Sequence, residues 1–310
     1  MARDWEAQLR EWGHAPGPDE QTKMENTEGQ IRAAIKASTA LVSRGVDVLA
    51  QGSYKNLTHI HRESDVDIRV VLRDSFFYDL DLADPNVKTD EAARARLLKR
   101  FEISPATYSF ETFRDDVGKA LVARFGPVPA VTPGDKAFNI HETRYFVDAD
   151  VVAALEHRRY HADGTYDEGV EFVSRKGQHI INWPEQQFRN GIEKNKVTSE
   201  RFKAMVRALK NLRVEMDDQK KPAAAKPISS FLIEYLVWNV PNDRFGHTDY
   251  YDDMKEVLRF LYLNTTSDET CWDWGEESEM KYLLRGGQPW TRAQVNAFVL
   301  AAWGHVGFKN

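Results

Sequence analysis

The sequence has few of the features that mark secreted, membrane-bound or nucleic-acid-coating proteins. Cys271 is the single cysteine among 310 residues, so no intrachain disulfide can form. No apolar run approaches the ~20 residues that cross a bilayer. The charged N-terminus lacks the apolar core of a signal peptide. A net charge of −6 disfavours broad contact with duplex nucleic acid. We therefore expect a cytoplasmic protein with no membrane contact and no nucleic-acid activator.

The chain nevertheless has the length and apolar content for two folded parts. Its 310 residues exceed the usual size of one hydrophobic core, and its 42% hydrophobic and 29% charged residues are typical of a globular protein. Strand and helix patterns alternate at first, and helical patterns dominate later. We expect an α/β domain over residues 1–190, whose N-terminal helix is able to pack on the helical lobe, and a helical domain over 191–310, with the site between them.

Hydrophobic periodicity predicts the individual elements. Strands are expected at 46–50, 65–72, 138–140, 144–155, 172–174 and 179–182. Helices are expected at 20–44, 90–101, 110–125, 198–216, 229–239, 252–263, 276–285 and 291–303. Residues 74–90 are expected to form a loop, and the polar stretch 217–227 is expected to connect two helices.

Two aspartates lie two residues apart in one of these strands. In Asp65-Val-Asp67 both carboxylates point to the same face, while the alternate apolar residues face the core. Neighbouring carboxylates repel each other unless a cation lies between them. Sites rich in carboxylate oxygens suit Mg²⁺, which shares its ligands with substrate phosphates. The pattern therefore favours a two-metal site that takes a nucleoside triphosphate.

A third carboxylate is expected from a neighbouring strand. The segment Phe146-Val-Asp148-Ala-Asp150-Val-Val152 offers two aspartates on one face. The alternation itself does not distinguish Asp148 from Asp150.

A Gly-Ser turn between the first two strands supplies a contact for phosphate. Gly52 lets the backbone approach phosphate oxygens closely, and Ser53 adds a hydroxyl donor. The start of a following helix leaves free N–H groups that favour an anion. Isolated Gly-Ser and Asp-x-Asp patterns are most often a turn and a solvated pair. Their order along this chain is far more restrictive and favours nucleotide transfer.

A basic stripe follows in the helical half. Lys203, Arg207 and Lys210 recur at helical spacing beside an apolar arc. Such a stripe is usually a solvated face. Here we expect it to face the carboxylate strands and to hold triphosphate oxygens.

These residues resemble the CD-NTase family of bacterial cyclic-oligonucleotide synthases, which are relatives of animal cyclic GMP-AMP synthase and oligoadenylate synthase. The resemblance covers about residues 25–305. It is carried by Gln51-Gly-Ser-Tyr54, Ser64-Asp-Val-Asp67, Val147-Asp-Ala-Asp-Val-Val152, Ile181-Asn-Trp-Pro184, Arg201–Lys210 and Ser229–Leu236.

The resemblance implies a polymerase-beta-like nucleotidyltransferase core joined to a C-terminal helical domain, bilobal, with the active site in the cleft. It selects Asp150 as the third ligand with Asp65 and Asp67, since the family's acid precedes a Val-Val pair; Asp148 stays as the alternative. Two Mg²⁺ ions are implied, with Mn²⁺ able to substitute. The nucleotide-binding residues implied are Gln51, Gly52, Ser53, Lys203, Arg207, Lys210, Ser230 and the stacking aromatic Phe231.

One segment departs from the family pattern. After Gly-Ser-Tyr, many relatives continue with a small residue and Gly-Thr, whereas this chain has Lys55-Asn-Leu-Thr58. A less flexible loop is expected there, with the metal ligands unaffected.

For Phe231 an ordinary position in the hydrophobic core is as good an explanation as the stacking role.

The reaction expected from the resemblance joins two nucleoside triphosphates, releases pyrophosphate and closes a cyclic di- or trinucleotide, which serves anti-phage signalling. Asn182 is a candidate for reading a base, since an amide can both donate to and accept from a Watson–Crick edge; a turn Asn is the alternative. UTP, with ATP as the second substrate, is the expected pair. A monomer with a regulatory protein partner is expected.

Three other functions compete with cyclic synthesis. The first is a terminal nucleotidyltransferase acting on RNA, protein or a small molecule. The second is a sensor activated by nucleic acid, and the third is a catalytically silent binding scaffold. The acidic balance disfavours the channels that RNA extension needs, and paired carboxylates without a metal are electrostatically costly.

Overall fold

The computed structural model describes residues 3–61, 65–218, 223–285 and 287–309. The chain forms two compact units that are interleaved along the sequence. The sheet unit comprises Pro18–Tyr54 and Ser64–Pro184, and the helical unit comprises Met1–Gly17, Lys55–Glu63 and Glu185–Asn310. The division differs from a single boundary at residue 190, because two short early segments pack among the helices.

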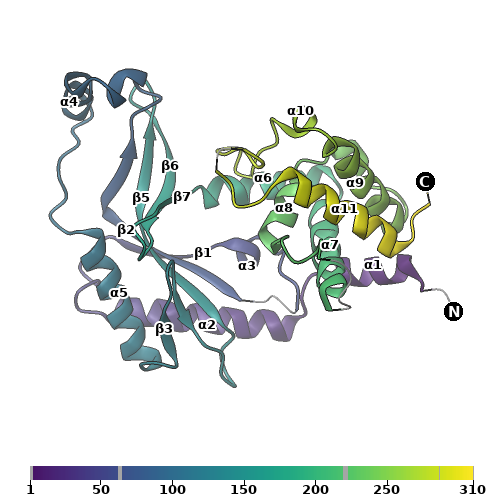
Figure 1. The fold of residues 1–310 in the computed structure, drawn as a ribbon. Coiled ribbons are helices and arrows are strands. Elements are labelled where there is room, and N and C mark those ends of the chain that lie inside the picture. The colour runs from purple at the N-terminus through teal and green to yellow at the C-terminus, as the bar shows by residue number, and fades with distance from the viewer. Residues whose placement is uncertain (1–2, 62–64, 219–222, 286, 310) are drawn as a thin grey trace. The chain divides into compact units, whose positions relative to one another are not determined.

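The sheet unit is built on a mixed sheet (Figure 1). Its strands are β1 (Val46–Ala50), β2 (Val66–Asp79), β3 (Val131–Pro133), β4 (Phe138–Ile140), β5 (Ala149–Tyr160), β6 (Tyr166–Val173) and β7 (His179–Asn182). The order is β1-β2-β5-β4-β3, with β6 pairing with β5 and β7. In the described part of the chain β2 and β5 form the parallel pair, and the other strand pairs are antiparallel.

Helices cover the core face of this sheet. The helices of the unit are α2 (Pro18–Ala37), α4 (Glu91–Arg100) and α5 (Phe110–Phe125), with a 3-10 turn, η1 (Pro85–Lys88), and the first residues of α3 (Gly52–Asn56). Val66, Ile68 and Val70 alternate along β2 and are fully buried against residues of α2 and α5. The alternate positions of β2, including Asp67, therefore belong to the opposite face of the sheet.

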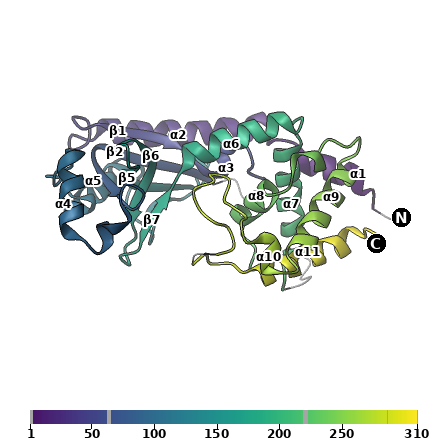
Figure 2. The same cartoon turned by 90° about the horizontal axis from the view of Figure 1, so that it is seen from above.

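The helical unit has α7 at its centre. Its helices are α1 (Trp5–Gly13), α6 (Pro184–Val197), α7 (Arg201–Asp218), α8 (Ser230–Trp238), α9 (Tyr250–Asn264), α10 (Asp268–Cys271) and α11 (Arg292–Val306), with a 3-10 turn, η2 (Asn242–Arg244). α1 and α9 both pack on α7 (Figure 2). Every residue of α7 from Phe202 to Lys210 is buried, so Lys203, Arg207 and Lys210 lie in the interior.

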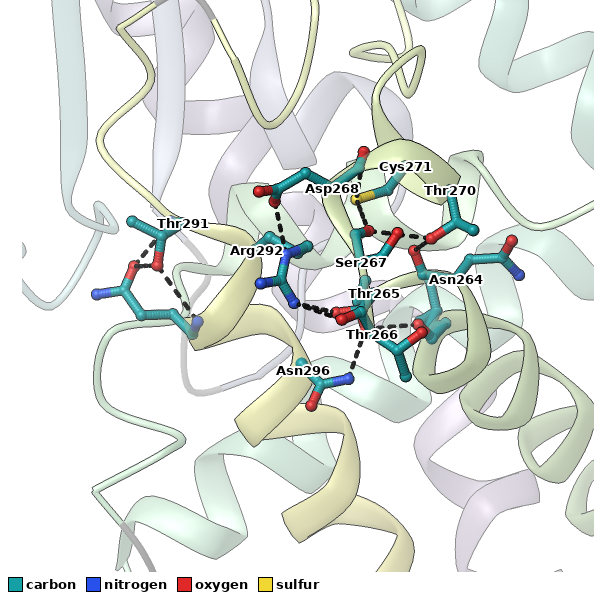
Figure 3. Close-up of polar contacts among 12 residues, drawn as sticks. Asn264, Thr265, Thr266, Ser267, Asp268, Thr270, Cys271, Thr291, Arg292 and Asn296 are labelled. Carbon is teal, nitrogen blue, oxygen red and sulfur yellow. Dashed lines mark hydrogen bonds and ion pairs between the residues drawn. The ribbon is translucent and has the colours of Figure 1, made fainter.

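A polar network joins α9, α10 and α11 (Figure 3). Arg292, at the start of α11, donates Nη1 to the carbonyl of Thr265 and Nε to the carboxylate of Asp268, both at 2.6 Å. Cys271 is buried beside it and donates to the Ser267 carbonyl. The contacts satisfy carbonyls that the end of α9 leaves without helical partners, so the network has a structural role.

In the described residues no helix is long and apolar enough to span a bilayer.

Several predicted elements have different limits in the structure. The helix expected at 20–44 ends at Ala37, since residues 38–44 turn through hydrogen bonds to the Ser38 carbonyl. The loop expected at 74–90 is wrong in its first part, because β2 continues to Asp79 after an irregularity between Leu72 and Phe76. Aromatic residues at 76–78 favour this continuation.

Two further differences concern the helical half and the strand before it. The helix expected at 276–285 is absent: Gly275 bridges to Tyr282, and the carboxylates of Glu276 and Glu277 are buried. Residues 144–148 precede β5 instead of belonging to it. Helices α1 and α6 have no counterpart among the predicted elements. The expected strand over β1 and the helices over α4, α5, α7, α8, α9 and α11 are confirmed within a few residues.

Candidate active site

Two of the expected metal ligands lie side by side in the sheet. Asp67 on β2 is directly opposite Asp150 on β5 in the parallel register. Val66, Ala149 and Val151, the neighbours that alternate with them, are buried in the core cluster, so both carboxylates lie on the other face. Asp67 and Asp150 thus occupy adjacent positions on one face.

The remaining two aspartates lie at the same end of the strands. Val66 donates its N–H to the carbonyl of Asp148 at 2.9 Å, which brings the exposed Asp65 beside the entry to β5. The Asp148 carboxylate accepts the Glu142 N–H at 2.6 Å and so closes the turn before β5. The Asp148 carboxylate is thus engaged by the backbone of its own turn, whereas Asp150 lies opposite Asp67. Both observations support Asp150 as the third ligand.

Asn139, which the sequence did not single out, orients the Asp150 carboxylate. Its side-chain Nδ2 donates to Asp150 Oδ1 at 2.5 Å. Asn139 lies on β4 directly opposite Asp150. Such outer contacts fix the direction in which a carboxylate presents its second oxygen.

The Gly52-Ser53 turn lies against the same aspartate. A Cβ atom at position 52 would be 3.0 Å from Cγ of Asp67 and closer still to Oδ2. Gly52 also has a φ of +62°, which glycine adopts without strain. Gln51, the preceding residue, donates its N–H to the carbonyl of Asp67 at 2.9 Å. The Gln51-Gly52 backbone is therefore held directly against Asp67, and the half-buried Ser53 follows at the start of α3.

The donor set fits Mg²⁺. Asp65, Asp67 and Asp150 offer only carboxylate oxygens. Asp67 and Asp150 lie on neighbouring strands, and Asp65, which immediately precedes β2, is exposed to solvent. Within the described residues, however, no three His, Cys, Asp or Glu side chains are already arranged around one point as a metal site. Since Mg²⁺ takes part of its ligands from water and substrate phosphates, a complete protein cage is not required.

The basic residues of α7 have different partners from those expected. Arg207 is 9% exposed; its Nε and Nη2 donate to the carbonyl of Gly13, and its Nη1 donates to that of Leu57 at 2.6 Å. Burial lowers the pKa of Arg207 to about 10. The guanidinium is therefore engaged by backbone carbonyls within the helical unit.

Lys210 and Lys203 are buried as well. Lys210 is 1% exposed and lies between the Thr58 carbonyl, at 3.0 Å, and Glu234, at 3.3 Å. Burial lowers the pKa of Lys203, and the nearby carboxylates of Glu277 and Glu234 partly offset this effect. The stripe predicted from helical spacing is real, but it lies in the interior of the helical unit.

The other two expected contacts of the helical unit lie at the start of α8. Ser229 caps the helix by accepting the Leu232 N–H, so Ser230 is its first residue. Phe231 is 42% exposed, and its ring packs against Tyr235 at 4.3 Å between centroids. The Phe231 ring is thus held by Tyr235 and remains partly accessible, so a nucleobase can stack on it.

Asn182 ends β7 in the sheet unit. It pairs with Val170 of β6 and is half-buried. A Cβ atom on Gly169 would lie 2.8 Å from the Asn182 carbonyl, so the backbone around Asn182 is closely packed. A fixed backbone is what a side chain that reads a base requires.

The fold and the row of strand aspartates beside a Gly-Ser turn define a nucleotidyltransferase. A model for the cGAS/DncV-like nucleotidyltransferase C-terminal helical domain matches residues 189–307. The cyclic dipyrimidine nucleotide synthases CdnE of Cecembia lonarensis and Legionella pneumophila are 39% and 38% identical to the chain, over 99% of it and 100% and 99% of the relatives. The solved Rhodothermus marinus CdnE c-UMP-AMP synthase with Apcpp and Upnpp matches with a TM-score of 0.82 at 28% identity, over 98% of each chain.

The chain therefore belongs to the cGAS/DncV-like nucleotidyltransferases. The expected fold class, a nucleotidyltransferase core with a C-terminal helical domain, is confirmed.

Proposed function

We propose that this enzyme is a cyclic dinucleotide synthase that uses UTP as one substrate. The observation that carries the proposal is the pairing of Asp67 with Asp150 beside Gly52, in a chain close in sequence to two cyclic dipyrimidine nucleotide synthases. The second substrate is either another pyrimidine triphosphate, as those relatives suggest, or ATP. The product would act as an anti-phage signal.

The side chains of the sheet unit divide the work of the reaction. A ribose hydroxyl oxygen of one nucleotide forms a bond to the α-phosphorus of the other, the bond to pyrophosphate breaks, and the hydroxyl proton passes to solvent. A second transfer of the same kind within the linear intermediate closes the ring and releases a second pyrophosphate. Asp65, Asp67 and Asp150 would hold two Mg²⁺ ions, which supply charge neutralisation at the phosphates when bound. Gly52 and Ser53 would contact the triphosphate of the donor. Catalysis then rests chiefly on positioning.

Base recognition is proposed for two residues. Phe231 offers an exposed ring face for stacking, and the amide of Asn182 offers both a donor and an acceptor. An Asn182→Ser variant tests the second role, because an unchanged preference among the four bases would remove Asn182 from recognition.

The test is incubation with all four labelled nucleoside triphosphates and Mg²⁺ or Mn²⁺. We expect a phosphatase-resistant product that contains uridine, identified by mass spectrometry, and no need for added DNA or RNA. The Asp65→Ala, Asp67→Ala double variant should form none. A product that phosphatase degrades would point instead to a terminal nucleotidyltransferase.

A further inference from the structure

Leu57 has a backbone conformation that leucine rarely adopts. Its φ is +56°, in the left-handed region where a Cβ atom is crowded and glycine is the usual residue. The side chain is 45% exposed, so its burial does little to offset this cost. A strained residue of this kind persists when its surroundings hold it in place.

The two residues that flank Leu57 are tied to one buried carboxylate. Asn56 donates Nδ2 to Oε1 of Glu234 at 2.8 Å, and Thr58 donates Oγ1 to Oε2 at 2.6 Å. All three partners are buried, Glu234 with only 2% exposed. Bonds to a charged, desolvated acceptor are among the stronger ones in proteins.

Two cations of α7 hold the same turn by its backbone. Arg207 donates to the carbonyl of Leu57, and Lys210 donates to the carbonyl of Thr58. Lys210 also forms the ion pair with Glu234. We name Asn56, Thr58, Lys210 and Glu234 the Glu234 cluster.

The turn is the continuation of the helix that begins at Gly52. α3 spans Gly52–Asn56, so its last residue belongs to the Glu234 cluster and its first lies against Asp67. We propose that the Glu234 cluster, together with Arg207, holds Leu57 in the left-handed conformation and thereby positions the Gly52-Ser53 turn for catalysis. The proposal rests on the proposed function and makes Arg207 and Lys210 positioning residues, not ligands of the triphosphate.

A network that merely stabilises the helical unit makes a different prediction. Its loss would reduce activity by the same factor whatever residue stands at position 57. In a positioning device the loss depends on the strain at Leu57, because glycine adopts the left-handed conformation at no steric cost. Glycine at position 57 should therefore make the enzyme tolerant of a missing contact to Glu234.

The experiment is a double-mutant cycle on the full chain with Thr58→Val and Leu57→Gly. Valine keeps the shape of Thr58 and removes the hydroxyl that Glu234 accepts. We expect T58V to lower kcat for cyclic product about tenfold, which corresponds to the loss of one hydrogen bond to a charged group. KM should be nearly unchanged. L57G should stay within about twofold of wild type and restore the T58V variant to within about threefold. Amide hydrogen exchange at residues 56–58 should accelerate in T58V.

Glu102→Gly is the matched control. Glu102 is exposed and also has a φ of +56°, but it lies in the sheet unit beyond the end of α4. The Glu102→Gly substitution should not restore the activity of the T58V variant. Equal T58V effects with leucine and glycine at position 57, or rescue by E102G, would overturn the positioning role, as would unchanged exchange in T58V. If wild type forms no cyclic product, the proposed function fails, and the exchange measurement still decides whether the cluster holds the turn.

Discussion

Gly52 lies so close to Asp67 that no side chain fits between them. A Cβ atom at position 52 would meet the Asp67 carboxylate at less than the normal contact distance, and φ at Gly52 is +62°. Both facts require glycine, one through space and the other through backbone conformation. The turn proposed to bind phosphate and the strand proposed to bind metal are thus fitted to each other at one residue.

Gly52→Ala should therefore greatly reduce activity while leaving most of the fold intact. The added methyl group must displace the Asp67 carboxylate or change φ, and either shift moves a proposed metal ligand. We expect product formation to fall at least about 100-fold, in line with the effect of ångström-scale misplacement. Mass spectrometry of the product, together with thermal unfolding, checks this.

Gly29→Ala is the matched control for that substitution. Gly29 lies inside α2, and nothing lies within 4 Å of a Cβ atom there. The change should leave activity unaltered and raise stability by about 0.5–1 kcal/mol, since alanine favours a helix over glycine. Equal losses in both variants would contradict the special role of Gly52.

Asp150 and Asp148 should differ sharply when each is replaced by asparagine. Asp150→Asn removes a carboxylate beside Asp67, so cyclic product should disappear at any Mg²⁺ concentration. Asp148→Asn weakens the contacts to the Glu142 N–H and to the His141 ring and should retain most activity. Rates measured across a Mg²⁺ titration test this. The reverse outcome would make Asp148 the third ligand.

Asn139→Ala should weaken metal binding without removing a ligand. The amide orients Asp150 Oδ1, and loss of such an outer contact typically costs about 10–100-fold in metal affinity. The Mg²⁺ concentration for half-maximal rate should rise by that factor, and Mn²⁺ affinity by calorimetry should fall in parallel. A changed maximal rate with unchanged metal dependence would contradict this role.

The sequence allows the local parts of this site to be predicted. The common face expected for Asp65 and Asp67 follows from strand periodicity, which is a local property, and the expected strand at 46–50 leads into the Gly52 turn. The pairing of Asp67 with Asp150 depends on the register of strands far apart in the sequence. Spacing alone offered Asp148 equally, and the family resemblance was needed to select Asp150.

The partners of Arg207 and Lys210 could not be predicted in the same way. A basic stripe at helical spacing has the same pattern whether it faces solvent, a triphosphate or buried carbonyls. Only the three-dimensional packing of residues 57 and 58 on α7 distinguishes these cases. The segment Lys55–Thr58 departs visibly from the family pattern, but the left-handed conformation of Leu57 has no signal in the sequence.

Phe231→Ala should affect nucleotide binding more than stability. The ring is 42% exposed, so its removal loses little core packing, whereas loss of base stacking should raise KM about 5- to 100-fold. Phe231→Trp should restore most of this loss. Trp272→Ala, which removes another aromatic ring that is 53% exposed, is the control and should leave KM unchanged.

Replacing Glu234 or Glu277 with neutral glutamine should change the stability of the protein in opposite directions. Both are buried; burial and the charge of Glu234 raise the pKa of Glu277 well above its usual value. For Glu234 burial acts in the same direction, but Lys210 and the hydrogen bond from Thr58 outweigh it and lower its pKa. These directions favour a negative charge on Glu234 and a proton on Glu277.

The pH dependence of stability follows from these directions. The raised pKa of Glu277 means that its stabilising contribution is complete below pH 4.5 and is lost as pH rises toward its folded pKa. Glu277→Gln does not titrate, so urea unfolding at pH 8 should show it more stable than wild type by at least about 1 kcal/mol, with a smaller difference at pH 5. Glu234→Gln leaves Lys210 buried without its anion and should cost about 3–5 kcal/mol at pH 8. If Glu277→Gln were as destabilising as Glu234→Gln at pH 8, the proton would not lie on Glu277.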